Sequence, residues 1–148
     1  MSAQQSMQIL LVEDDHGHAT LLRRALQRGG VSAEVSCFED GEDVLAFLRG
    51  PQAETDACEC YLLLLDLQLP RMGGLAVLRE LRADEVLAAM RVLVLSTTEC
   101  TREVREARSL GCPDLLTKPL DFERFRKAVI DLGVWNRIHS KGASEPDS

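Results

Sequence analysis

The chain has 148 residues, and its 17 basic and 24 acidic side chains give a formal net charge of −7. This length suits one domain that buries its own core, and the negative charge disfavours non-specific binding to nucleic acid or to an anionic membrane surface. No apolar run approaches the roughly 20 residues needed to cross a bilayer, and the first residues do not resemble a signal peptide, so we expect a cytoplasmic protein.

Short apolar runs alternate with longer amphipathic segments along the chain. The runs predicted to form strands are residues 9–12, 33–37, 61–65, 92–95 and 114–116. Segments near 16–29 and 41–49, and others starting near 74, 100 and 122, repeat apolar residues at spacings of three and four, which is typical of helices that bury one face. Five alternations of strand and helix predict an α/β fold with a doubly wound, five-stranded parallel sheet covered on both faces.

Glycine and proline mark the ends of the predicted elements. Gly29-Gly30, Gly50-Pro51 and Gly111 with Pro113 follow three of the helical segments. We expect an exposed loop at residues 51–59, one domain over residues 1–139, and a disordered polar tail at residues 140–148.

Polar residues follow four of the predicted strands. They are Glu13 and Asp14 after the first, Asp66 after the third, Ser96 and Thr97 after the fourth, and Lys118 after the fifth. Ligands of an open α/β sheet bind beyond the carboxyl ends of its strands, so these residues should meet at one edge.

Three carboxylates and one ammonium at that edge carry a formal charge of −2, and like charges about 4 Å apart repel by roughly 4 kcal/mol at an effective dielectric near 20. A divalent cation would cancel this charge, and an all-oxygen ligand set favours Mg²⁺. We expect Asp14 and Asp66 to be direct ligands, the backbone carbonyl of Gln68 to be a third, and Glu13 to reach the ion through water.

With Mg²⁺ bound, Asp66 has the chemistry of a carboxylate nucleophile that takes a phosphoryl group as an acyl phosphate. Lys118 and the cation would share the charge on the phosphoryl oxygens. Ser96 would donate a hydrogen bond to a phosphoryl oxygen only after transfer, which makes it a candidate trigger for movement.

These motifs, in this order, resemble the receiver domain of response regulators in bacterial two-component signalling, over residues 7–132. The resemblance implies a flavodoxin-like fold, with Glu13 and Asp14 as the acidic pair and Asp66 as the phosphoacceptor. It also implies that Ser96 is the switch hydroxyl and that Lys118 is the lysine before a cis proline, Pro119.

The segments 12–15, 66–74 and 118–121 are similar to the small regulators partnered with bacterial phytochrome histidine kinases. This similarity implies a stand-alone regulator without an output domain. It also implies a homodimer formed through the face that the family calls α4-β5-α5. One departure is Leu115, in the switch region, where the family often has Tyr or Phe, so an aromatic flip is excluded here. Another is Glu13, where many members have Asp.

We therefore expect a response regulator that takes its phosphoryl group from a sensor histidine kinase, including one of the phytochrome type. It would not be an enzyme, beyond self-catalysed transfer and slow autodephosphorylation. One alternative is a pseudo-receiver that binds proteins without phosphate. Another is a hydrolase with an aspartate nucleophile, although Leu67-Gln68 after Asp66 offers no second acid.

Several residues have two readings. Asp15 is expected to cap a helix, and His16 and His18 to lie at its exposed start rather than to bind metal or phosphate. Gln68 and Thr97 either tune water access to the acyl phosphate or simply pack. Trp135 is either a partner contact, which we favour, or a local packing residue. The five cysteines are read as reduced thiols, with no metal site at Cys58 and Cys60.

Overall fold

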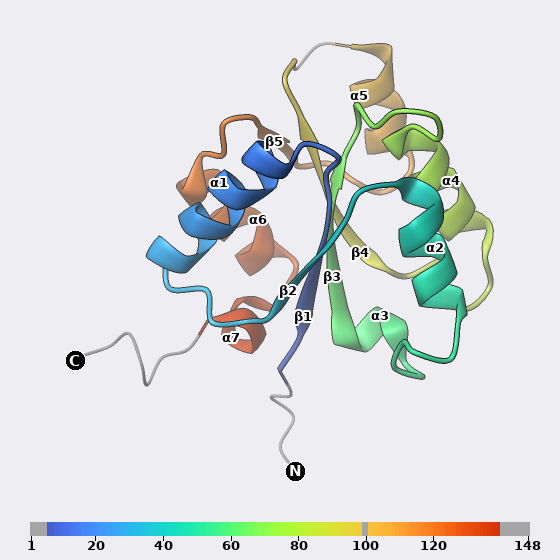
Figure 1. The fold of residues 1–148 in the computed structure, drawn as a ribbon, viewed down its shortest axis with the longest axis horizontal. Coiled ribbons are helices and arrows are strands. Elements are labelled where there is room, and N and C mark those ends of the chain that lie inside the picture. Colours follow the sequence, from blue (N-terminus) through green and yellow to red (C-terminus); the bar gives the residue numbers. More distant parts are fainter. Residues whose placement is uncertain (1–5, 99–100, 140–148) are drawn as a thin grey trace.

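The computed structural model describes residues 6–98 and 101–139. One parallel sheet lies at its centre, in the order β2-β1-β3-β4-β5, as Figure 1 shows. The strands are β1 (Gln8–Val12), β2 (Val35–Phe38), β3 (Tyr61–Asp66), β4 (Arg91–Ser96) and β5 (Leu115–Thr117). The predicted doubly wound sheet is confirmed, with strand boundaries that differ from the prediction by one or two residues.

Helices cover both faces of the sheet (Figure 1). On one face lie α1 (His16–Arg28), α6 (Phe122–Asp131) and α7 (Trp135–Ile138), and on the other α2 (Gly41–Arg49), α3 (Ala57–Cys60), α4 (Gly74–Ala83) and α5 (Arg102–Ser109). Successive residues of a strand point to opposite faces of the sheet. Leu62 and Leu64 therefore pack in the core beneath α1, α6 and α7, whereas Leu63 and Leu65 pack in the core beneath α2, α4 and α5. This explains why β3 is apolar at every position before Asp66.

Side-chain caps fix where the helices begin. The carboxylate of Asp15 accepts a hydrogen bond from the backbone N–H of His18, which confirms its predicted capping role for α1. Asp40, Thr101 and Asp121 cap α2, α5 and α6 in the same way. Gly29 follows α1 directly, as predicted.

Two short helices were not predicted. The expected exposed loop at 51–59 is wrong at its end, because α3 starts at Ala57, whose side chain is buried in the core. The second is α7, where the carbonyl of Ile138 accepts hydrogen bonds from the N–H groups of Ser32 and Ala33, in the segment before β2. The predicted tail at 140–148 lies outside the described residues.

None of the helices in the described part of the chain has both the length and the apolar character needed to pass through a bilayer.

Candidate functional site

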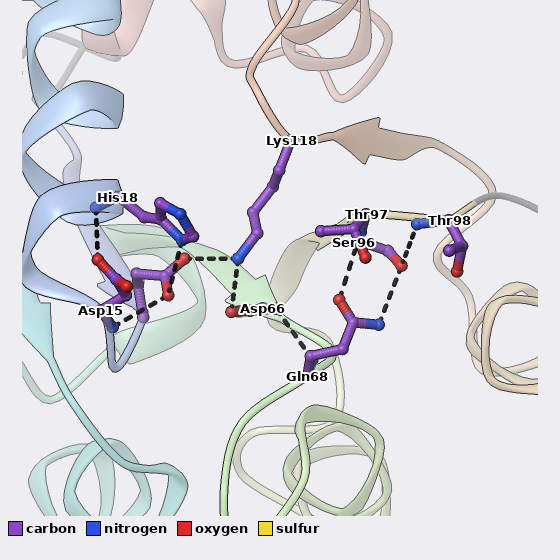
Figure 2. A network of polar contacts seen from close by, with 9 residues as sticks. Asp15, His18, Asp66, Gln68, Ser96, Thr97, Thr98 and Lys118 are labelled. Atoms are coloured by element: carbon purple, nitrogen blue, oxygen red, sulfur yellow. Dashed lines mark hydrogen bonds and ion pairs between the residues drawn. The ribbon is translucent and has the colours of Figure 1, made fainter.

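The carboxyl ends of the strands bring the predicted polar residues together (Figure 2). Asp66 and Ser96 are the last residues of β3 and β4, and Glu13 and Lys118 come directly after β1 and β5. The strands are parallel and in register, with Asp66 opposite Leu95 and Ser96 opposite Thr117, so all of them end at the same edge. The expected convergence is confirmed.

Lys118 is bonded to two buried carboxylates. Its Nζ lies 2.9 Å from Glu13 Oε1 and 2.9 Å from Asp66 Oδ2. Glu13 is 2% exposed and Asp66 is 1% exposed, so water does little to screen these pairs. The peptide bond between Lys118 and Pro119 is cis, as expected.

The charges of this cluster depend on one another. Burial raises the pKa of Glu13 above its ordinary value, although hydrogen bonds from Lys118 and from the N–H of Asp15 act in the opposite direction. Burial also lowers the pKa of Lys118, but its hydrogen bonds to Asp66 and Glu13 outweigh this, so the net pKa is raised. Lys118 is therefore a permanent cation at neutral pH.

Three carboxylates could hold a metal ion. Glu13, Asp14 and Asp66 each offer an oxygen, and these oxygens lie within 4.8 Å of one another. Asp14 is exposed, whereas the other two are buried. Hard oxygen donors and a solvent-facing side suit Mg²⁺, which keeps several of its waters. Both oxygens of Glu13 accept hydrogen bonds, from Lys118 and from the N–H of Asp15, and both oxygens of Asp66 do so as well, from Lys118 and from the N–H of Gln68. Direct ligation by Asp14 and Asp66 therefore stays a prediction. Coordination by the Gln68 carbonyl stays a prediction.

The position of Asp66 depends on a close approach by α4. A Cβ atom on Gly74, the first residue of that helix, would lie 2.2 Å from the carbonyl oxygen of Asp66 and 2.7 Å from Leu67 Cα. Only glycine leaves room for these backbone atoms. The sequence alone does not indicate this contact, because β3 and α4 meet only in the folded chain.

Ser96 is fully buried, and its hydroxyl oxygen accepts two hydrogen bonds. The donors are the side-chain amide of Gln68, at 3.1 Å, and the backbone N–H of Thr98, at 3.2 Å. Gln68 Oε1 also accepts from the N–H of Thr97, at 3.3 Å. Gln68 thus contacts the Ser96 hydroxyl directly, and Thr98 is a neighbour of the site that the sequence did not indicate.

The other candidate residues lie around this centre. His18 Nδ1 is 3.9 Å from Glu13 Oε2, and His16 pairs with Glu39 on the surface. Among the described residues, neither histidine belongs to the metal-binding group. Leu115 is buried in the core as an aliphatic residue beside Val94.

Trp135 packs within its own chain. Its ring stacks on His139 with 4.7 Å between centroids, and it meets Phe122 edge-on at 6.2 Å. Arg126 lies over the same ring, 5.9 Å from its centroid. These contacts support a local packing role for Trp135 over the favoured partner contact.

A groove of about 340 Å³ opens beside Lys118. Its walls are mostly apolar and come from α1, from the residue after β4 and from the segment after β5. They are formed by His18, Leu21, Leu22, Ala25, Thr97, Lys118, Pro119 and Leu120. Leu21, one of these residues, is 61% exposed.

A five-stranded parallel sheet that gathers an acidic pair, an aspartate and a lysine at its carboxyl edge defines a receiver domain. The family model for the response regulator receiver domain matches residues 9–130, and the chain belongs to that family. Receiver domains act in two-component systems, partner with sensor histidine kinases and bind Mg²⁺ at an acidic pocket.

Several known proteins are similar over most of the chain. The probable methanogenesis regulatory protein FilR2 of Methanothrix harundinacea is 34% identical, over 93% of this chain and 90% of that protein. The bacteriophytochrome response regulator RtBRR is 34% identical, with a TM-score of 0.75 over 87% of this chain and 79% of its own. AtBRR, another bacteriophytochrome response regulator, is 30% identical with the same TM-score, over 88% and 94%.

The Mn²⁺-bound form of response regulator Rcp1 is also similar. It is 28% identical with a TM-score of 0.65, over 90% of this chain and 97% of its own.

Proposed function

We propose that this protein is a phosphorylation-dependent response regulator that accepts a phosphoryl group from a sensor histidine kinase on Asp66, in a Mg²⁺-dependent reaction. The observation that carries this proposal is the placement of the Lys118 ammonium 2.9 Å from Asp66, beside a group of three carboxylates. A buried aspartate with an adjacent cation and a cluster of acids is suited to receive a phosphoryl group rather than to support the fold alone.

In the proposed transfer, an Asp66 oxygen forms a bond to phosphorus while the bond from phosphorus to the phosphohistidine nitrogen of the kinase breaks. The N–H of Gln68 donates to Oδ1 at 2.9 Å, and Lys118 donates to Oδ2. These two bonds fix the direction of the carboxylate before the phosphoryl group arrives, which lowers the cost of orientation.

Lys118 then stabilises the charge on the phosphoryl oxygens, because an ammonium at this distance in a buried pocket favours a group that carries up to two negative charges. Mg²⁺ held by Asp14 and Asp66, with Glu13 nearby, would supply further electrostatic stabilisation. The buried hydroxyl of Ser96, the last residue of the neighbouring strand β4, can donate a hydrogen bond to the new group.

The protein would act as a phosphoacceptor and not as an enzyme for external substrates. The turn after Asp66 is Leu67-Gln68, which places no second acid beside the nucleophile. Loss of the phosphoryl group by slow autodephosphorylation would reset the switch.

The proposed partner is a sensor histidine kinase. The similarity to AtBRR and RtBRR favours a kinase of the phytochrome type. The apolar groove beside Lys118, with the exposed Leu21, offers a docking surface next to the reacting carboxylate.

The output face proposed is formed by α5, β5 and α6, which correspond to the family's α4-β5-α5 elements. β5 is an edge strand with one unpaired side, and Ser96 and Leu115 link the site to it. We propose that two copies of the chain pair through this face.

The test is a binding measurement with beryllofluoride and Mg²⁺, which together mimic a phosphoryl group. We expect the wild type to respond, and to take labelled phosphate from a candidate sensor kinase, while Asp66→Asn does neither. Asp15→Asn is the matched control, because its side chain caps α1 and should not affect binding. If the wild type fails to bind beryllofluoride and to accept phosphate, the pseudo-receiver alternative replaces this proposal.

A further inference from the structure

Gln68 connects the ends of two neighbouring strands. Its backbone N–H donates to Asp66 Oδ1 at 2.9 Å, while its side chain spans to the segment that follows β4. There the amide nitrogen donates to Ser96 Oγ and the amide oxygen accepts from the N–H of Thr97 (Figure 2). One residue is thus bonded to the candidate phosphoacceptor and to the candidate switch residue.

The hydroxyl of Ser96 is held in place by these contacts. A hydroxyl oxygen accepts at most two hydrogen bonds, and here Gln68 and the N–H of Thr98 supply both. The side chain is fully buried, so water cannot readily take the place of either donor. Any displacement of the hydroxyl must either break its hydrogen bond to Gln68 or move the Gln68 side chain with it.

We propose that the carboxamide of Gln68 is a latch that holds Ser96 and the start of the β4–α5 segment in the resting arrangement. This inference rests on the proposed function for its link to phosphorylation. A phosphoryl group on Asp66 competes with Gln68 for the Ser96 hydroxyl, and it also disturbs the Asp66 oxygen that the Gln68 N–H binds. Gln68 is therefore a positioning residue that sets how easily the switch leaves its resting state.

The latch is of moderate strength. The side chain of Gln68 is exposed, and the net effect of one hydrogen bond between neutral groups corresponds to roughly a twofold to tenfold change in an equilibrium. Release of the latch should therefore shift the resting equilibrium by about threefold to tenfold.

The test uses Gln68→Met, which keeps the length of the side chain and the backbone carbonyl but removes both side-chain hydrogen bonds. The first readout is hydrogen exchange of the Thr98 amide in the resting protein with no phosphoryl mimic. Thr98 N–H is bonded to Ser96 and not to Gln68, so its exchange reports the mobility of the hydroxyl. We expect exchange about threefold to tenfold faster in Gln68→Met.

The second readout is the affinity for beryllofluoride with Mg²⁺, expected to be about threefold to tenfold higher in Gln68→Met than in the wild type. Gln52→Met, in the exposed loop before α3, is the control and should change neither readout.

Unchanged exchange of the Thr98 amide overturns the latch, whatever the affinity for beryllofluoride is. If the Thr98 amide exchanges faster in Gln68→Met but the wild type does not bind beryllofluoride, the latch is supported and the proposed function is rejected. A weaker affinity in Gln68→Met also overturns the proposal, because it would mean that Gln68 favours the active arrangement.

Discussion

Lys118 donates a hydrogen bond to Asp66, with 2.9 Å between Nζ and Oδ2, and the same ammonium bonds to Glu13. This ammonium is the main partner of two carboxylates that are almost completely buried. Removal of one member of a buried pair costs more than the pair contributes, because the charge that is left behind has no compensation.

Lys118→Met should therefore lower the free energy of unfolding of the metal-free protein by about 3 kcal/mol. It should also abolish the response to beryllofluoride, while saturating Mg²⁺ restores part of the lost stability. Urea unfolding with and without Mg²⁺ measures both effects. Lys127→Met, at an exposed position of α6, should change stability by less than about 0.5 kcal/mol. Equal losses in the two variants would contradict the role given to the buried pair.

The stabilisation by Mg²⁺ should depend on pH through Glu13. Burial raises the pKa of this side chain above its ordinary value of 4.5. The stability that the protonated side chain contributes is therefore fully present below pH 4.5 and is lost as pH rises through the raised pKa. As pH rises, the folded protein has to hold more of Glu13 in its ionised form, which a bound cation favours. We expect Mg²⁺ to raise the melting temperature more at about pH 7.5 than at about pH 5.

In Glu13→Gln the same pH difference should be smaller, because the residue no longer titrates. Calorimetric melts at the two pH values, with and without Mg²⁺, make the comparison. A pH difference of the same size in both proteins would show that Glu13 is not its source.

Gly74→Ala should displace the end of β3. The new Cβ would lie 2.2 Å from the carbonyl oxygen of Asp66, and backbone atoms cannot move aside as a flexible side chain can. We expect a loss of about 2 kcal/mol in unfolding free energy and a weaker response to beryllofluoride. Gly73→Ala is a matched control, since its Cβ would meet only the Leu67 carbonyl oxygen at 3.9 Å. Wild-type behaviour of both variants would refute this explanation for glycine.

Trp135→Ala should lower stability rather than assembly. The ring packs on Phe122 and His139, so its removal should cost about 2 kcal/mol in unfolding free energy. Val86→Ala, at a side chain that is 71% exposed, should cost less than about 0.5 kcal/mol. Thermal melts and light scattering test the two roles together. If Trp135→Ala keeps its stability but changes the oligomeric state, Trp135 is a partner contact after all.

The proposed dimer is expected to have about twice the 16.4 kDa mass of the chain by light scattering. Arg105→Glu, on the exposed side of α5, should dissociate it, because a two-fold interface repeats each change on both subunits. Arg24→Glu on α1 should leave it intact. A single monomeric species, with and without beryllofluoride, would rule out pairing through α5, β5 and α6.

Much of the fold was predictable because its signals are local. The apolar run at 61–65 and the acids after strands one and three place Glu13, Asp14 and Asp66 at one sheet edge without any knowledge of long-range contacts. The space at Gly74, the bond from Gln68 to Ser96 and the packing of Trp135 were not predictable, because each depends on segments that approach only in the folded chain. The Gln68 carbonyl as a ligand, the cytoplasmic location and the tail at 140–148 stay predictions.

The wide spacing of the site residues along the chain has a consequence during synthesis. Glu13 and Asp66 leave the ribosome well before Lys118, and the three-residue strand β5 that positions this lysine is among the last strands made. A nascent chain therefore has its acids without their counter-ion, and the pocket closes only once translation has passed β5. A kinase that recognises the assembled pocket would then act on finished molecules and ignore incomplete ones.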